Sequence, residues 1–267
     1  MWRIGVCTWT FGPLPLEAIA ARLEQLGFDG VELYGDVSLD PRATRRLLEA
    51  HGLEVYSLTP MNVDLTHPEP WVRRAALDDY ARLIEFARAL GGARVSCHGH
   101  VGRFAPLADR RMEWGWLVEA LQTLAETAAQ AEVTLVFEVL NRYETHLVHT
   151  TAEALELLEA VGHPNLKVLL DAYHMNLEEP DPAAAIRRTG DRLGLVHLAD
   201  SNRRGIGHGH TDFPALLHAL QEVGYTGPLI LEVTAPGPDP FTPVKEGDYL
   251  AQLEADLKDS LTWLRAC

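Results

Sequence analysis

Residues 167–197 read KVLLDAYHMNLEEPDPAAAIRRTGDRLGLVH. Short apolar runs open and close this stretch, at 167–171 and 193–197, and each run ends in an ionisable residue. Residues 181–189, which lie between them, have the composition and periodicity of a helix. Two apolar strands separated by a helical segment are typical of a parallel β–α–β unit. The stretch therefore predicts parallel strands that are buried on both faces.

The same alternation continues in both directions along the chain. Apolar, β-branched runs predict eight strands, at 3–8, 30–33, 53–58, 94–97, 134–138, 167–171, 193–197 and 228–232. Helical periodicity predicts helices at 16–26, 41–51, 71–90, 112–131, 151–161, 181–189, 213–223 and about 244–264. Eight such units in 267 residues match a TIM (β/α)8 barrel, which takes about 250 residues. We expect an α/β fold of this kind, with one domain over residues 1–267.

An open doubly wound sheet is the alternative fold, but two of its usual motifs are missing. The first predicted strand is not followed by GxGxxG, and the sequence has no GxxxxGK[ST] loop. Helix-boundary signals agree with the predicted units, since Asp40 precedes Pro41 as an N-cap and Gly27 lies where a helix should stop. The Pro-rich stretch 236–243 is interpreted as a loop. The barrel is favoured, and it would place its active site at the carboxyl ends of the strands.

Composition and charge limit the class of protein. The chain is 47% apolar and 23% charged, which is typical of a folded domain. Its formal net charge of −15 argues against nucleic acid and anionic membranes as partners. Cys7, Cys97 and Cys267 lack zinc-type or redox-type spacing, which suits reduced thiols. With no signal-like start and no apolar run approaching a membrane span, we expect a soluble, cytoplasmic protein.

Four successive predicted strands end in residues that can bind a metal. TLVFE ends at Glu138, KVLLD at Asp171, LGLVH at His197 and PLILE at Glu232. An ionisable residue at the end of an apolar strand is costly unless the site needs its charge. Three carboxylates and one imidazole suit Mn²⁺, Mg²⁺ or Co²⁺, whereas structural zinc more often recruits thiolates. The pattern predicts one divalent cation, with Mn²⁺ first among the three metals.

Polar segments follow three of these strands, at 138–146 (EVLNRYETH), 170–179 (LDAYHMNLEE) and 197–213 (HLADSNRRGIGHGHTDF). We interpret them as polar loops above the predicted cation. Arg203 is a candidate to hold a substrate oxygen. His208 and His210 lie in a glycine-rich turn, which either approaches the ligand or faces solvent.

On these residues the sequence resembles the ketose 3-epimerases of the xylose-isomerase-like TIM-barrel superfamily. The resemblance is strongest over 134–234, and the separations of 33, 26 and 35 positions between the four strand-end residues fit that family. It implies that the four are metal ligands and that Glu138 and Glu232 also form an acid/base pair. It also implies that Glu144, His174 and Arg203 contact a sugar near its carbonyl end, and that the protein is a homodimer or homotetramer. The His208 and His210 pair departs from this family and resembles broader sugar-isomerase relatives.

The resemblance implies C3 epimerisation of a ketose through an enediolate, with two carboxylates acting on opposite faces of the planar intermediate. Protonation at the neighbouring carbon would give aldose–ketose isomerisation instead. Hydroxypyruvate isomerase and inosose dehydratase are alternatives with a similar barrel and metal set. An abasic-site endonuclease fits the charge poorly, and a sugar-binding barrel without catalysis is the alternative that is not an enzyme.

Several other residues have two interpretations. Glu32 ends the second predicted strand and either binds a distal sugar hydroxyl or pairs with a basic neighbour. His98 and His100 are expected to line the pocket, with a second metal site or a structural role as alternatives. The three remaining candidates are tryptophans, for which core packing is favoured over stacking on a sugar: Trp9, Trp114 and Trp116.

Overall fold

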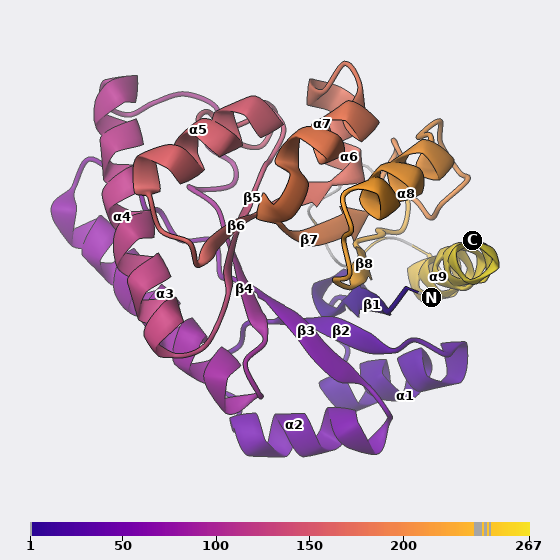
Figure 1. Cartoon of the computed structure of the whole chain (residues 1–267). Coiled ribbons are helices and arrows are strands. Elements are labelled where there is room, and N and C mark those ends of the chain that lie inside the picture. Colours follow the sequence, from indigo (N-terminus) through magenta and orange to yellow (C-terminus); the bar gives the residue numbers. More distant parts are fainter. Residues whose placement is uncertain (1, 238–241, 243–244, 246) are drawn as a thin grey trace.

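Eight parallel strands form a closed barrel in the computed structural model, which describes residues 2–237, 242, 245 and 247–267 (Figure 1). Neighbouring strands follow each other in sequence order, and β1 pairs with β8 to close the barrel. The strands are β1 (Ile4–Cys7), β2 (Gly30–Tyr34), β3 (Glu54–Thr59), β4 (Arg94–Cys97), β5 (Leu135–Glu138), β6 (Leu166–Asp171), β7 (Leu193–Leu198) and β8 (Leu229–Leu231). The predicted TIM barrel is confirmed, and each predicted strand boundary is correct to within one residue.

Helices surround the barrel, as Figure 1 shows. They are α1 (Leu16–Leu26), α2 (Pro41–Ala50), α3 (Pro70–Ala89), α4 (Arg110–Gln130), α5 (Thr151–Val161), α6 (Ala172–Glu178), α7 (Pro182–Thr189), α8 (Phe213–Glu222) and α9 (Tyr249–Ala266), with short 3-10 helices η1 (Thr8–Phe11) and η2 (Gly190–Arg192). The predicted boundaries agree to within two residues, except for the start of the last helix. Position 244 and most of the predicted loop 236–243 lie outside the described residues. The segment after Asp171 was predicted as a loop and is helix α6, which Asp171 caps by accepting a hydrogen bond from the backbone N–H of Tyr173 (2.9 Å).

Alternation along the strands separates two cores. One large cluster lies between the barrel and its helices, and a small cluster fills the barrel interior. The interior cluster consists of Cys7, Tyr56, Val136, Leu169, Leu195 and Ile230. Side chains two positions apart lie on the same face of a strand, so the residues two positions beyond Val136, Leu169, Leu195 and Ile230 also point inward. Strand periodicity thereby selects which polar residues meet inside the barrel mouth.

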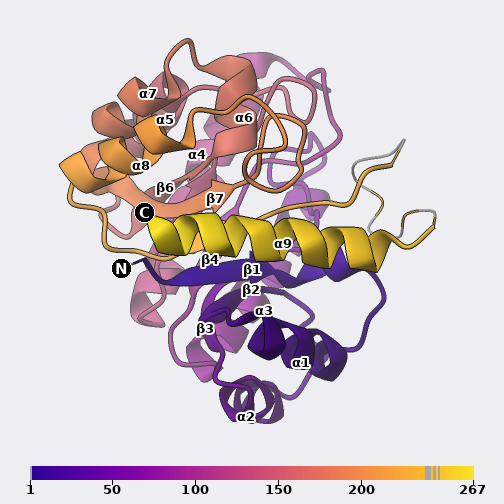
Figure 2. The same ribbon diagram turned by 90° about the vertical axis from the view of Figure 1, so that its right-hand side faces the viewer.

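The C-terminal helix α9 lies alongside β1, and the two chain ends are close together (Figure 2). Arg265 near the end of α9 donates hydrogen bonds to the backbone carbonyl of Trp2 (3.1 Å) and to both carboxylate oxygens of Asp29 (2.7 Å each). These contacts join the last helix to the first βα unit. No helix in the described part of the chain is long and apolar enough to cross a membrane.

Candidate metal centre and active site

The four strand-end residues form one buried cluster. Glu138, Asp171, His197 and Glu232 each offer a ligand atom, and these atoms all lie within 4.8 Å of one another. Each follows its inward-pointing apolar residue by two positions, so the cluster forms the layer above Val136, Leu169, Leu195 and Ile230. The apolar layer closes the barrel below the polar one, and it keeps the polar groups at the mouth.

The ring of His197 is oriented by Glu32. Its Nε2 lies 3.0 Å from Glu32 Oε2, so this nitrogen carries the proton that the carboxylate accepts. Its Nδ1 lies 3.6 Å from Glu138 Oε1 and 3.5 Å from Glu232 Oε2. Burial acts to lower the pKa of this imidazole, but Glu32 and Glu232 outweigh it and raise the pKa well above its usual value, so Nδ1 also carries a proton in the metal-free protein and would release it to bind a cation. A histidine whose second nitrogen donates to a carboxylate is the usual arrangement of a metal ligand.

Glu32 itself does not border the cavity, and its interpretation as a ligand for a distal sugar hydroxyl is not what the geometry favours. The carboxylate is fully buried and accepts hydrogen bonds from Ser57 Oγ (2.5 Å) and Thr59 Oγ1 (2.8 Å) besides that of His197. Strand β2 continues two residues beyond Glu32, which leaves this side chain below the mouth. The geometry favours the other interpretation, in which Glu32 pairs with a basic neighbour, here His197.

The two glutamates have pKa values shifted in opposite directions. Burial raises the pKa of Glu138, and the neighbouring His197 only partly offsets this. Burial also acts to raise the pKa of Glu232, but Arg203 and His197 outweigh it and hold the pKa of Glu232 well below its usual range. A pair of carboxyls whose environments separate their pKa values suits one group to donate a proton and the other to accept one.

Some buried polar atoms in and beside the cluster lack a hydrogen-bond partner, which bears on whether the cluster can bind a cation. Among the described residues, buried Asp171 Oδ2, His174 Nε2 and His197 Nδ1 have no hydrogen-bond partner. Asp171 Oδ2 and His174 Nε2 lie 3.5 Å apart, and burial together with the Glu232 carboxylate raises the pKa of Asp171 to about 7. Buried polar atoms of this kind need a partner. A divalent cation would be that partner for Asp171 Oδ2 and His197 Nδ1. Its positive charge would also favour the ionised form of the carboxylates. The four clustered side chains are therefore suited to bind a divalent cation.

Cys7 also lies near the cluster, where its thiol is 3.6 Å from Glu32 Oε1 and 3.9 Å from Glu232 Oε1. Burial, with Glu32 and Glu232 nearby, raises the pKa of this thiol well above its usual value. A protonated thiol is a poor metal ligand. Cys7, Cys97 and Cys267 are free cysteines, as predicted.

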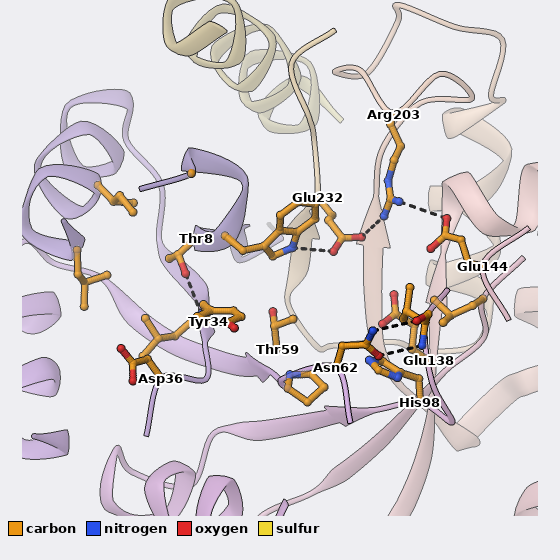
Figure 3. Close-up of a pocket in the computed structure, with 18 of the residues that line it drawn as sticks. Thr8, Tyr34, Asp36, Thr59, Asn62, His98, Glu138, Glu144, Arg203 and Glu232 are labelled. Atoms are coloured by element: carbon orange, nitrogen blue, oxygen red, sulfur yellow. Dashed lines mark hydrogen bonds and ion pairs between the residues drawn. The ribbon is translucent and has the colours of Figure 1, made fainter. Parts of the chain in front are cut away.

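A cavity of about 630 Å³ opens above the cluster (Figure 3). Of the predicted site residues, Glu138, Glu144, His174, Arg203, Glu232 and His98 line it. His174 Nδ1 accepts a hydrogen bond from Asn141 Nδ2 (2.8 Å), which also donates to Glu144 Oε1 (2.9 Å). Burial, together with Arg203, holds the pKa of His174 well below its usual value, so this imidazole is neutral.

Arg203 links the two sides of the cavity, as Figure 3 shows. Its guanidinium lies 2.9 Å from Glu232 Oε2 and 3.4 Å from Glu144 Oε1, and over the ring of Tyr173 at 4.7 Å from the centroid. Its backbone has φ 61°, a left-handed conformation that non-glycine residues rarely adopt. Strain of this kind persists where the surrounding structure holds it and gathers at functional sites.

The loop that carries Arg203 is held from helix α9. Buried Asp256 accepts hydrogen bonds from Arg204 Nε (2.5 Å) and Nη2 (2.8 Å) and from the backbone N–H of Gly205 (3.3 Å). Gly205 packs so closely that a Cβ there would lie 2.7 Å from the Asp256 carbonyl oxygen. His208 lies 3.6 Å from the same carboxylate.

His208 and His210 are exposed and are not among the cavity-lining residues that the structure describes. His210 Nδ1 contacts the hydroxyl of Ser201 instead (3.0 Å). The geometry therefore agrees with the interpretation of a solvent-facing turn, and it offers no support for their predicted contact with substrate.

The three tryptophans have different surroundings. Trp9 lines the cavity and donates a hydrogen bond from Nε1 to Glu232 Oε1 (3.0 Å). Trp114 packs against the outer core, and the Trp116 ring lies 4.3 Å from the Arg73 guanidinium. The sequence favoured packing for all three, because nothing in it indicates that the Trp9 indole reaches Glu232, which directly follows β8.

Comparisons with known proteins identify the family of this chain. The xylose isomerase-like TIM barrel family model matches residues 20–267, and the chain belongs to that family. An L-ribulose 3-epimerase of Mesorhizobium japonicum is 32% identical over 87% of this chain and 81% of the relative. A 3-dehydro-D-guloside 4-epimerase of Escherichia coli is 27% identical over 99% of this chain and 100% of the relative. The solved D-allulose 3-epimerase of Methylomonas sp. in complex with D-allulose is 28% identical, with a TM-score of 0.86 over 99% of this chain and 96% of that one.

Within the family, this chain is an enzyme of the epimerase and isomerase type. The relatives do not favour the hydroxypyruvate isomerase, inosose dehydratase, abasic-site endonuclease and non-catalytic alternatives.

Proposed function

We propose that the chain is a divalent-metal-dependent ketose 3-epimerase. Glu138, Asp171, His197 and Glu232 would hold one cation, for which Mn²⁺ is our first choice and Mg²⁺ or Co²⁺ the alternatives. The observation that carries the proposal is the cluster itself, because two glutamates whose pKa values are shifted apart share it with an unpartnered imidazole nitrogen.

When bound, the cation supplies electrostatic stabilisation of the negative charge that develops on substrate oxygens. Glu232, whose carboxyl is held ionised by Arg203, would remove the proton from carbon 3 of the ketose. Glu138 would deliver a proton to the opposite face of the planar enediolate, and the two groups would exchange roles in the reverse direction. The inversion of carbon 3 follows from protonation on the second face.

Glu144, His174 and Arg203 would bind the substrate near its carbonyl end. Each lines the cavity beside the cluster, and the neutral His174, whose Nδ1 accepts from Asn141, can donate one hydrogen bond from Nε2 to a sugar oxygen. Arg203 adds a positive charge where an oxygen becomes negative. His98 also lines this cavity, and burial with the neighbouring His100 lowers its pKa to about 4, so it would meet the sugar as a neutral ring.

Solvent deuterium exchange tests the proposal. With Mn²⁺ in D₂O, we expect deuterium to enter carbon 3 of a ketose while its C3 epimer accumulates, both measured by NMR. Exchange at carbon 1 with formation of an aldose would instead identify an isomerase. No exchange into any ketose, phosphorylated or not, would exclude the proposed chemistry.

Asp256→Asn is expected to lower kcat/KM by about tenfold to a hundredfold, because small displacements of positioned groups cost activity on that scale. The amide cannot accept both hydrogen bonds from Arg204 while it accepts that of Gly205. The loop therefore loses contacts that hold Arg203 in position. Steady-state kinetics measure the change. Asp259→Asn on the exposed face of the same helix is the matched control, and equal kinetics in both variants would contradict the positioning role.

We further propose that residues 1–267 form one domain and that the enzyme is a cytoplasmic homodimer or homotetramer that binds no nucleic acid and no membrane. The net charge of −15 supports the last two points. Light scattering coupled to gel filtration measures the oligomeric state directly.

A further inference from the structure

The cavity is larger than a single ketose requires. Its volume is about 630 Å³, within the range of about 300–1,000 Å³ that accommodates drug-sized ligands. A ketohexose has about twelve non-hydrogen atoms, and even at the ~30 Å³ that a whole water molecule takes in the liquid they would fill about 360 Å³. More than a third of the cavity therefore remains beyond the reacting sugar.

The remaining space lies away from the metal centre. Figure 3 shows Tyr34 and Asp36 at the opposite end of the cavity from Glu138 and Glu144. We call this end the outer subsite and define it by Tyr34, the last residue of strand β2, and by Asp36 and Leu39, which follow that strand.

The outer subsite has one aromatic surface and one polar group that face the cavity. Tyr34 is 44% exposed although its backbone is fixed by a hydrogen bond from its N–H to Thr8 Oγ1 (2.8 Å). Asp36 Oδ1 accepts hydrogen bonds from the backbone N–H (3.0 Å) and hydroxyl (2.6 Å) of Ser38, and its Oδ2 accepts no hydrogen bond from the residues that the structure describes. The exposed ring and the carboxylate oxygen are thus both available to a ligand.

These groups match the chemistry of a sugar ring. A pyranose has an apolar C–H face, which packs on aromatic rings, and a rim of hydroxyls, which donate to carboxylates. Leu14, Leu16 and Leu39 also line the cavity and add apolar surface. A phosphate fits poorly, since Asp36 would repel it and Arg203, the only arginine or lysine among the described lining residues, lies at the metal end.

We propose that the outer subsite binds a second sugar unit, so that the preferred substrate is a ketose that carries a glycosyl group on the end distal from its carbonyl. This inference rests on the proposed function for the reacting end. It assigns Tyr34 as the platform for the second ring and Asp36 as the acceptor for its hydroxyls.

The test compares D-fructose with 6-O-α-D-glucosyl-D-fructose, both with Mn²⁺ and both followed by deuterium exchange at carbon 3. We expect kcat/KM to be at least about tenfold higher for the disaccharide, a discrimination that one additional contact region can supply. Tyr34→Ala should lower the ratio of the two kcat/KM values toward one, and Tyr34→Phe should retain it. Trp71→Ala, which removes an exposed aromatic ring outside the described cavity lining, is the control.

The outcomes separate the two proposals. Exchange of fructose with no preference for the disaccharide, or an equal loss on both sugars in Tyr34→Ala, would overturn the outer subsite and leave the epimerase. If neither sugar exchanges, the epimerase fails, and calorimetric titration decides the subsite. Tighter binding of the disaccharide that Tyr34→Ala removes would then support it, and equal binding of both sugars would overturn it.

Discussion

Glu232→Gln is expected to reduce kcat for ketose epimerisation by about a thousandfold or more, since a positioned general base contributes about 10²–10⁴ and Glu232 is also a proposed ligand of the cation. The amide cannot take a proton from carbon 3. The side-chain volume is unchanged, and the remaining oxygen can keep one of the two hydrogen bonds that the carboxylate accepts, from Trp9 Nε1 at Oε1 or from Arg203 Nη2 at Oε2. The fold should therefore survive, which circular dichroism and the thermal midpoint can verify beside steady-state kinetics.

Glu138→Gln gives a sharper test of the two-face mechanism. This variant retains Glu232, so one of the two C3 epimers should still exchange its proton with D₂O while net inversion is lost. NMR detection of exchange without epimerisation would distinguish this outcome from general collapse of the site. Glu119→Gln, at an exposed position on α4, is the matched control. Near-normal epimerisation by both Glu138→Gln and Glu232→Gln would eliminate the mechanism.

The meeting of the four strand-end residues was predictable because it depends on local features that repeat. Each apolar run is a strand, each strand ends at the same rim, and the residue that ends the run is ionisable. The inward direction of Glu138, for example, follows from the inward direction of Val136 two positions earlier. Local pattern and topology together therefore suffice to bring these side chains to one place.

The residues around the cluster could not be predicted in the same way, because they are positioned by contacts between segments far apart in the sequence. Glu32 and His197 meet across 165 positions of sequence, and Asp256 reaches Arg204 from a helix on the outside of the barrel. Helix α6 was missed because it starts directly at the end of β6 and has only seven residues. The polar residues Ser57 and Thr59, which alternate on β3, are a sequence signal that could have indicated a polar partner inside the barrel.

Chelation is expected to abolish activity, and added Mn²⁺ should restore it. The cation would bind the native cluster and not the unfolded chain, so its removal also lowers stability. At a cation concentration of a hundred times Kd the stabilisation is about 2.7 kcal/mol. For a chain of this size that corresponds to a rise of about 5 °C or more in the thermal midpoint. Asp171→Asn should lose most of this rise, and full activity in protein shown by elemental analysis to be metal-free would contradict the proposed site.

The stabilisation by Mn²⁺ should be larger at pH 8 than at pH 5.5. Burial and Glu232 raise the pKa of Asp171 to about 7 in the folded, metal-free protein, above its value in the unfolded chain. Such a group favours the folded state at low pH, and this contribution is lost as the pH rises through about 7. The raised pKa of Glu138 acts in the same direction. The metal-free protein therefore loses stability over the range in which proton release strengthens cation binding, and thermal midpoints with and without Mn²⁺ at the two pH values measure the difference.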